Sequence, residues 1–137
     1  MEQHCVFLAL GTNLGNLHEN LERACREIEK NVGQITDRSQ WRSSEPWGFD
    51  SPNTFLNGVV KVETPLSPLQ LLSETQAIER RMGRRKKTKA GYEDRIVDID
   101  ILLYDDLQID LPQLKIPHPL MELRDFVMIP LKEITEK

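Results

Sequence analysis

The sequence predicts an α+β protein in which residues 1–137 form a single domain, a ferredoxin-like βαββαβ sandwich. Three observations support this prediction. Short apolar runs alternate with segments of helical periodicity, a pair of strand-like segments separates the two helix-like ones, and 39% of the residues are hydrophobic, which fits one core. We therefore expect a mainly antiparallel sheet with the helices packed on one face. A small doubly wound sheet is the alternative, and the strand pair between the helices argues against it.

The first half of the chain predicts a strand, a helix and a second strand. Residues 5–10 form a short apolar run that stops at a glycine, which is typical of a buried strand. Over residues 17–31, apolar side chains recur at helical spacing with charged side chains between them, and Gly33 then ends the helix. Residues 34–42 predict a second strand, and residues 43–53, rich in Ser, Pro and Gly, predict a loop.

The next segments predict another strand and another helix. Residues 55–63 predict a strand because valines and charged side chains alternate toward its end. Ser67 is suited to cap a helix, Pro68 suits the first helical position, and Gln70 completes a capping box. We expect this helix to run to Met82, where a glycine follows.

The last third of the chain predicts the remaining strand and a short helix. Residues 98–104 predict a fourth strand, which we place at the centre of the sheet because it is so apolar. A turn at residues 105 and 106 leads to a shorter pairing segment. A short helix is expected within residues 118–126. The sequence shows no internal repeat, low-complexity tract or domain linker.

The distribution of charge favours a small anionic ligand. The net charge is −4, from 18 basic and 22 acidic residues, but residues 80–89 hold seven of the basic residues and no acidic one. A chain that is acidic apart from one basic loop is a poor general binder of nucleic acid. We expect this loop to hold a small anion at one place.

Composition also favours a cytoplasmic protein. No apolar run approaches the roughly 18 residues of a membrane helix. The apolar run at residues 5–10 is too short for a secretory signal, and the four residues before it are too weakly basic. Cys5 and Cys25 form neither a CxxC pair nor a metal-ligand cluster. We therefore expect a reducing, cytoplasmic setting and no association with a membrane.

Asp98 and Asp100 are the most informative residues. On a strand they point to one face while Ile99 and Ile101 point to the other. Two solvent-facing acids are the usual explanation of such a short, common pattern. Here the strand is otherwise apolar and follows a basic loop that ends near Arg95, and divalent cations compensate buried carboxylates well. We therefore expect metal ions, up to two, that hold a polyphosphate.

Cationic residues on either side of this strand are candidate phosphate ligands. Arg84 and Arg95, with one or two lysines, are suited to neutralise a triphosphate and to stabilise charge in a transition state. A solvated helix terminus is the alternative explanation. His118, followed by Arg124, is a candidate hydrogen-bond donor to phosphate, although a lone histidine is more often structural. The sequence contains neither a P-loop nor the protein kinase motifs.

Several short motifs recur together in an order and spacing that are highly specific. They are Gly11 to Gly15, Pro46-Trp47-Gly48, Phe55-Leu56-Asn57, Gln76 and Glu79 before Gly83-Arg84, Arg95 to Leu102, and Pro117-His118 followed by Arg124 and Phe126. Through these motifs nearly the whole chain, from Leu8 to Leu131, resembles the 6-hydroxymethyl-7,8-dihydropterin pyrophosphokinases.

The resemblance implies a ferredoxin-like fold and an ATP-dependent diphosphotransferase (pyrophosphokinase) of folate biosynthesis. Such an enzyme transfers pyrophosphate from ATP to the hydroxyl of 6-hydroxymethyl-7,8-dihydropterin and releases AMP. The resemblance implies that Asp98 and Asp100 hold two Mg²⁺ ions and that Arg84 and Arg95 act with them in catalysis. The residues it implies in ATP binding are Gln76, Arg84, Lys87, Tyr92, Ile101, Lys115, His118 and Arg124. Those it implies in pterin binding are Ser44, Trp47, Phe55, Asn57 and Phe126.

Two other classes of function are weighed against this one. A non-catalytic ferredoxin-like module that binds nucleotides or RNA would stack bases on aromatic side chains of the sheet, but only 6% of the residues are aromatic. A small regulatory or structural domain would leave the aspartate pair and the basic loop unexplained. Without the resemblance, core packing is the preferred explanation of Phe55 and Phe126. We expect a monomer that binds small-molecule substrates and no nucleic acid.

Overall fold

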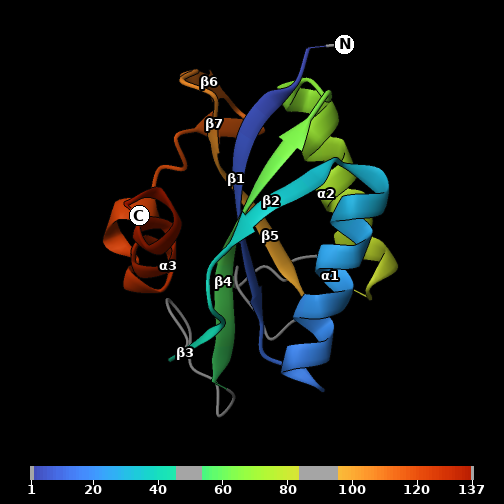
Figure 1. The fold of residues 1–137 in the computed structure, drawn as a ribbon, viewed down its shortest axis with the longest axis vertical. Helices are drawn as coiled ribbons and strands as arrows, with labels where there is room; N and C mark the ends of the chain where they lie inside the picture. Colours follow the sequence, from blue (N-terminus) through green and yellow to red (C-terminus); the bar gives the residue numbers. More distant parts are fainter. Residues whose placement is uncertain (1, 46–53, 84–95, 137) are drawn as a thin grey trace.

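The computed structural model describes residues 2–45, 54–83 and 96–136. A central antiparallel sheet has helices on both sides (Figure 1). The elements are, in chain order, β1 (His4–Thr12), α1 (Leu17–Asn31), β2 (Gln34–Arg38), β3 (Arg42–Ser44), β4 (Phe55–Thr64), α2 (Pro68–Arg81), β5 (Asp98–Tyr104), β6 (Ile109–Leu111), β7 (Leu114–Ile116), the 3-10 helix η1 (Met121–Leu123) and α3 (Asp125–Thr135).

The order of the strands confirms the ferredoxin-like prediction but not the place of β5. The strands lie in the order β2-β4-β1-β5, β3 also pairs with β4, and every pairing is antiparallel. The strand over residues 98–104 is therefore at the edge of this sheet, and the prediction that it is central was wrong. β5 is apolar because its side chains are buried in the hydrophobic clusters on both faces of the sheet. An edge strand can be buried in this way when both faces of the sheet are covered.

The sheet buries a hydrophobic cluster on each face. On one face, α1 and α2 pack against alternate residues of the strands, such as Leu8, Leu10, Ile99 and Ile101. On the other face, α3 packs on a second cluster, made of Ala9, Val59, Leu102, Met121, Val127, Leu131 and Ile134. The prediction of helices on one face holds for α1 and α2, while α3 lies on the opposite side of the sheet (Figure 1).

The first two helices begin and end where their sequences predict. α1 is capped by Asn16, whose side chain accepts a hydrogen bond from Glu19 N–H, and its last turn is closed by the N–H of Gly33. α2 begins with the predicted capping box, in which the side chains of Ser67 and Gln70 each bond to the backbone of the other residue. Local sequence alone is sufficient for both helices because their caps are local.

Two other segments differ from prediction. Residues 34–42 form no continuous strand, because the chain leaves the ladder after β2 and returns to it as β3, with both strands paired to β4. The predicted short helix corresponds to η1, but α3 continues to Thr135 and carries Pro130 inside it. A proline within a helix removes a main-chain donor, and packing of α3 on the sheet compensates for that loss. Within the described ranges, no helix is long and apolar enough to cross a membrane.

Candidate active site

Three neighbouring strands bring candidate substrate and metal residues onto one face of the sheet. Gly11 on β1 lies opposite Asn57 on β4 and opposite Asp98 on β5. Side chains that oppose one another in antiparallel strands share a face, and so do residues two positions along a strand, which adds Phe55 and Asp100. This is the face that α3 covers further along the strands. Residues from distant parts of the sequence thus meet beside α3.

Gly11 leaves room for the side chain of Asn57. A Cβ atom at Gly11 would lie 2.9 Å from Asn57 Oδ1 and 3.7 Å from Phe55 Cδ1. Asn57 is only 5% exposed, and its Nδ2 donates a hydrogen bond to Ser44 Oγ at 2.6 Å. The amide of Asn57 is thus held between the hydroxyl of β3 and the backbone of β1.

Asp98 and Asp100 project from that face, while Ile99 and Ile101 lie in the core on the other side. The side chain of Asp100 is 29% exposed, and its Oδ2 lies 3.8 Å from a guanidinium nitrogen of Arg124. Asp98 is half-buried. Partly accessible carboxylates are the hard oxygen ligands that Mg²⁺ prefers, and Mg²⁺ usually takes its other ligands from substrate phosphates and water. The two side chains therefore fit a magnesium ion.

Arg124 and Phe126 come to this face from the junction of η1 and α3. The side chain of Arg124 is 5% exposed, and its guanidinium carbon lies 5.7 Å from the centre of the Phe126 ring. Such a cation–π contact orients both groups. The guanidinium thus lies near both the aromatic ring and the carboxylate of Asp100.

His118 is held near the aspartates by its backbone. β5 has a bulge at Leu102 where it pairs with β1, and the Leu102 carbonyl accepts a hydrogen bond from His118 N–H at 3.0 Å. The ring Nδ1 accepts a hydrogen bond from Leu120 N–H at 3.3 Å, so the neutral ring carries its proton on Nε2. Burial lowers the pKa of His118, Arg124 lowers it further, and Asp98 opposes the shift. His118 is therefore suited to donate from Nε2 as a neutral ring.

The outer edge of β5 offers main-chain groups to a ligand. Glu79 on α2 accepts a hydrogen bond from Ile99 N–H at 2.7 Å, so the main chain of Ile99 is directed away from β1. Because main-chain direction alternates along a strand, the N–H and C=O of Ile101 are directed to the same outer edge. Lys115 is exposed on the adjacent β7 and forms an ion pair with Asp110. Ile101 and Lys115 thus belong to two strands, β5 and β7, that contact each other.

Gln76 lies apart from the aspartates. It is exposed on α2, one turn before Glu79, and α2 packs on the face opposite to Asp98 and Asp100. Sequence reasoning used Glu79 only as a marker of resemblance, although its carboxylate is buried and holds β5. Its spacing from other buried residues of α2, Leu71, Thr75 and Ile78, is helical and would have placed it on the buried side.

The remaining predicted site residues lie outside the described ranges. They are Trp47, expected at the pterin, and Arg84, Lys87, Tyr92 and Arg95, expected at the phosphates. The described residues of the predicted site that share the α3 side of the sheet are Ser44, Phe55, Asn57, Asp98, Asp100, Arg124 and Phe126.

The chain is similar to known proteins over nearly its whole length. The sequence profile of the family described as 7,8-dihydro-6-hydroxymethylpterin-pyrophosphokinase (HPPK) matches residues 7–136. The 2-amino-4-hydroxy-6-hydroxymethyldihydropteridine pyrophosphokinase of Porphyromonas gingivalis is 45% identical over 131 residues, which cover 94% of this chain and 89% of that protein. Proteins of the same name from Aquifex aeolicus and Bacillus subtilis are 40% and 36% identical. The matches cover 94% and 96% of this chain, and 79% and 78% of those proteins.

Solved structures share the fold. The crystal structure of Plasmodium falciparum HPPK-DHPS A437G with SDX-DHP matches with a TM-score of 0.81 and 19% identity, over 97% of this chain and 42% of that one. The wild-type protein with pteroate gives a TM-score of 0.79 and 18% identity, over 96% and 40%. This chain thus spans about two-fifths of those longer chains, and at such identity the likeness concerns the fold alone. From the profile match and the relatives at 36–45% identity, the chain belongs to the 7,8-dihydro-6-hydroxymethylpterin-pyrophosphokinase family.

Proposed function

We infer that this chain is an ATP-dependent pyrophosphokinase of folate biosynthesis. It transfers pyrophosphate from ATP to the hydroxyl of 6-hydroxymethyl-7,8-dihydropterin and releases AMP. The observation that carries this inference is the row formed by Asn57, Gly11 and Asp98 across three strands. It places an amide suited to the edge of a heterocycle beside a pair of carboxylates suited to a metal–phosphate complex, so that acceptor and donor substrates can meet on one face.

The pterin is held by aromatic and amide groups. A flat, polar heterocycle is bound well by aromatic faces and by hydrogen bonds at its edge. Phe55 and Phe126 supply the faces, and Asn57 supplies both a donor and an acceptor. Ser44 orients the Asn57 amide through the 2.6 Å hydrogen bond. Trp47 is proposed to line the same pocket.

Asp98 and Asp100 are proposed to hold two Mg²⁺ ions. Bound magnesium would neutralise charge on the triphosphate and favour attack at the β-phosphorus. Through the bound cations, the two carboxylates would hold the phosphate chain beside the pterin hydroxyl, and proximity of the two reactants is itself a large part of catalysis. The contact between Asp100 and Arg124 fixes one carboxylate while leaving part of it accessible.

The other cationic and polar residues bind ATP. His118 donates from Nε2 to a phosphate oxygen, and Arg124 adds positive charge beside it. The main chain at Ile101 and Lys115 meets the adenine. Arg84 and Arg95 stabilise charge during transfer, and the further ATP contacts are assigned to Gln76, Lys87 and Tyr92.

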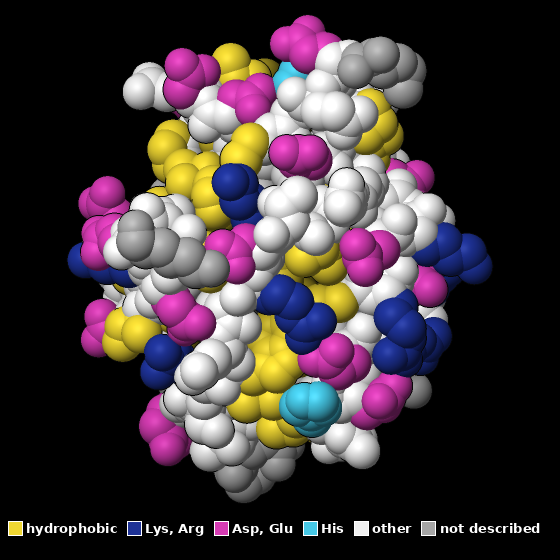
Figure 2. All heavy atoms as spheres, in the orientation of Figure 1, with side chains coloured by type: hydrophobic (Ala, Val, Ile, Leu, Met, Phe, Trp, Pro, Cys, Tyr) yellow, Lys and Arg dark blue, Asp and Glu magenta, His cyan; other side chains and the backbone are white. Residues whose placement is uncertain are grey.

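A nucleotide- or RNA-binding module without catalysis is not favoured. The aspartate pair lies among the residues that would have to meet a phosphate backbone, and carboxylates repel it. On the face of the molecule in Figure 2, acidic, basic and apolar side chains are interspersed, which is typical of a solvated surface and not of a nucleic-acid-binding patch. We also propose that the protein acts as a cytoplasmic monomer, in keeping with two free thiols, Cys5 and Cys25.

Release of AMP tests the proposed reaction. We expect AMP to form from ATP only when 6-hydroxymethyl-7,8-dihydropterin and Mg²⁺ are both present. ADP in place of AMP would indicate transfer of a single phosphate, and AMP release without the pterin would indicate hydrolysis of ATP. Either result contradicts the proposed function.

A further inference from the structure

The segment that joins β2 to β3, residues 39–41, is called the connector. Both strands pair with β4, so the connector determines where β3 begins. β3 has only three residues, and in its register Ser44 lies opposite Phe55, where its hydroxyl reaches the Asn57 amide. A slip of one residue would turn Ser44 to the opposite face of the sheet. The position of Ser44 therefore depends on what fixes the connector.

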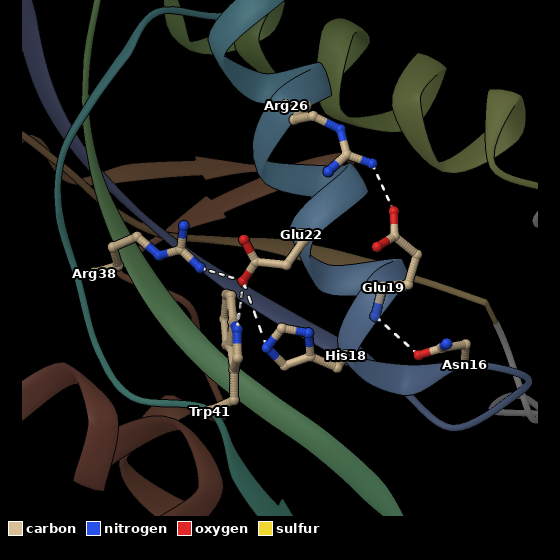
Figure 3. Close-up of polar contacts among 7 residues, drawn as sticks. All are labelled: Asn16, His18, Glu19, Glu22, Arg26, Arg38 and Trp41. Atoms are coloured by element: carbon tan, nitrogen blue, oxygen red, sulfur yellow. Dashed lines mark hydrogen bonds and ion pairs between the residues drawn. The ribbon is translucent and has the colours of Figure 1, made fainter.

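On the side of α1, the connector is fixed by Trp41. Its ring covers Gly58, where a Cβ atom would lie 2.3 Å from a ring carbon. Its Nε1 donates a hydrogen bond at 2.9 Å to Glu22 Oε2, the same oxygen that accepts from Arg38 at 2.5 Å (Figure 3). Glu22 thus ties the end of β2 and the end of the connector to α1.

On the side of α3, one carboxylate of that helix, Glu133, binds both the connector and the first residue of β3. Glu133 Oε2 accepts a hydrogen bond from the main-chain N–H of Gln40 at 2.9 Å. Its Oε1 accepts one from the guanidinium of Arg42 at 3.1 Å. The two oxygens therefore hold two positions of one segment, the backbone of Gln40 in the connector and the side chain of Arg42 at the first residue of β3. Such a two-point contact resists both a slip and a rotation of β3.

Glu133 also lies on the helix that supplies Phe126. The two residues are seven positions apart, which is two turns of α3, so they lie along the same side of the helix. Glu133 therefore joins two walls of the proposed pterin pocket, the aromatic wall on α3 and the Ser44 wall on β3.

We propose that Glu133 is a positioning residue for pterin recognition, which acts through β3 to place Ser44 and hence the Asn57 amide. This proposal rests on the proposed function, since it assigns the pterin to Asn57. Glu133 itself meets neither substrate. Its contribution is to affinity for the pterin and not to affinity for ATP, because Asp98, Asp100 and His118 are held by contacts that do not include it.

The test separates the two substrates in steady-state kinetics. Glu133→Ala should raise KM for the pterin about fivefold, the factor that corresponds to one lost hydrogen bond, and leave KM for ATP within about twofold. Glu133→Gln keeps an acceptor for Gln40 N–H and should recover most of the affinity. Glu19→Ala, which removes another helical Glu–Arg pair, serves as the matched control and should change neither constant. Equal rises in both KM values, or an unchanged pterin KM in folded Glu133→Ala, would overturn the proposal.

A second measurement works without turnover. The side-chain amide signals of Asn57 in ¹⁵N-labelled, ligand-free protein should shift in Glu133→Ala and remain in place in Glu19→Ala. If Glu133→Ala does not fold, Glu133→Asp keeps the charge but is too short to reach both donors, and the same shift is expected. An unmoved Asn57 amide overturns the positioning role even if the wild-type protein releases AMP. A wild-type protein that releases no AMP overturns the proposed function and leaves the amide shift to decide the role of Glu133.

Discussion

The carboxylate of Glu79 on α2 accepts a hydrogen bond from the main-chain N–H of Ile99 on β5 at 2.7 Å. Ile99 stands between Asp98 and Asp100, so the bond holds the backbone from which both carboxylates project. Glu79 is only 6% exposed, and it belongs to α2, which packs on the face of the sheet opposite to Asp98 and Asp100. A helix on one face thus fixes the strand that presents the aspartates on the other.

Replacing Glu79 should therefore lower the free energy of unfolding. Glu79→Ala leaves the Ile99 N–H buried without its acceptor, which costs about 1–3 kcal/mol in the free energy of unfolding. Glu79→Gln keeps an acceptor oxygen and should lose less. Urea unfolding monitored by circular dichroism measures the difference. Glu74→Ala, on the same helix, is the control and should stay within about 0.5 kcal/mol of wild type; an equal loss in both variants would show that the Glu79 bond contributes nothing specific.

Asp98→Asn should lower kcat at least about a hundredfold while the protein stays folded. Loss of groups that merely support metal ligands lowers activity about 10–100-fold, and Asp98 is proposed to be a ligand itself. Steady-state AMP release at a range of Mg²⁺ concentrations makes the measurement, and removal of Mg²⁺ by a chelator should abolish wild-type turnover reversibly. Asp106→Asn, in the turn after β5, is the matched control. Wild-type turnover by Asp98→Asn would remove the metal assignment.

Gly11→Ala should weaken pterin binding through Asn57. The added methyl group would lie 2.9 Å from Asn57 Oδ1, which forces the amide to move. We expect KM for the pterin to rise about fivefold or more, since crowding of this kind costs about 1–3 kcal/mol and each 1.4 kcal/mol corresponds to a factor of about ten. In an Asn57→Ala background the same substitution should have little further effect, because the crowded atom is gone. Independent, multiplicative effects of the two substitutions would contradict this explanation.

Much of the fold follows from local sequence, and the exceptions have tertiary causes. α1 and α2 were predicted well because amphipathic spacing and caps are both local. The break between β2 and β3 was missed because Ser39 bonds to Val59 and Trp41 covers Gly58, contacts with a strand some 20 residues away. α3 was missed because its stability comes from packing on the sheet, which outweighs Pro130.

The candidate site divides in the same way. Alternation along β5 is enough to put Asp98 and Asp100 on one face. The pairing of Gly11 with Asn57 and Asp98 depends on the register between strands, and a single sequence carries no direct signal for register. The resemblance implied site roles for Asn57 and Asp98 and gave Gly11 only as part of a motif, and the register of the sheet is the physical reason why the three residues are neighbours.

Acid should destabilise the protein partly through Glu22. The hydrogen bond from Arg38 lowers the pKa of Glu22 below its ordinary value of 4.5, the hydrogen bond from Trp41 lowers it further, and burial opposes them. A carboxyl whose pKa is lower in the folded state contributes stability that is fully present above its ordinary pKa and is lost as the pH falls through its folded value. Glu22→Gln should therefore flatten the loss of unfolding free energy below about pH 5.

Chemical unfolding of both proteins from pH 7 down to pH 3 makes this comparison. Glu19→Gln, which removes a carboxylate paired with Arg26 on the same helix, is the matched control. Parallel acid profiles for wild type and Glu22→Gln would mean that the Glu22 contacts in Figure 3 contribute no pH-dependent stability.

The two nitrogens of His118 should be separable by substitution. Nδ1 accepts from Leu120 N–H, so Nε2 is the donor available to a phosphate. An asparagine places a polar atom near Nδ1, and a glutamine places one near Nε2. His118→Asn should therefore keep wild-type stability but raise KM for ATP about tenfold or more, since hydrogen bonds to charged groups contribute roughly 1.5–3 kcal/mol. His118→Gln should bind ATP better than His118→Asn while unfolding more easily. The reverse order, with ATP binding retained by His118→Asn and lost in His118→Gln, would show that the Leu120 contact matters to the nucleotide and that Nε2 does not.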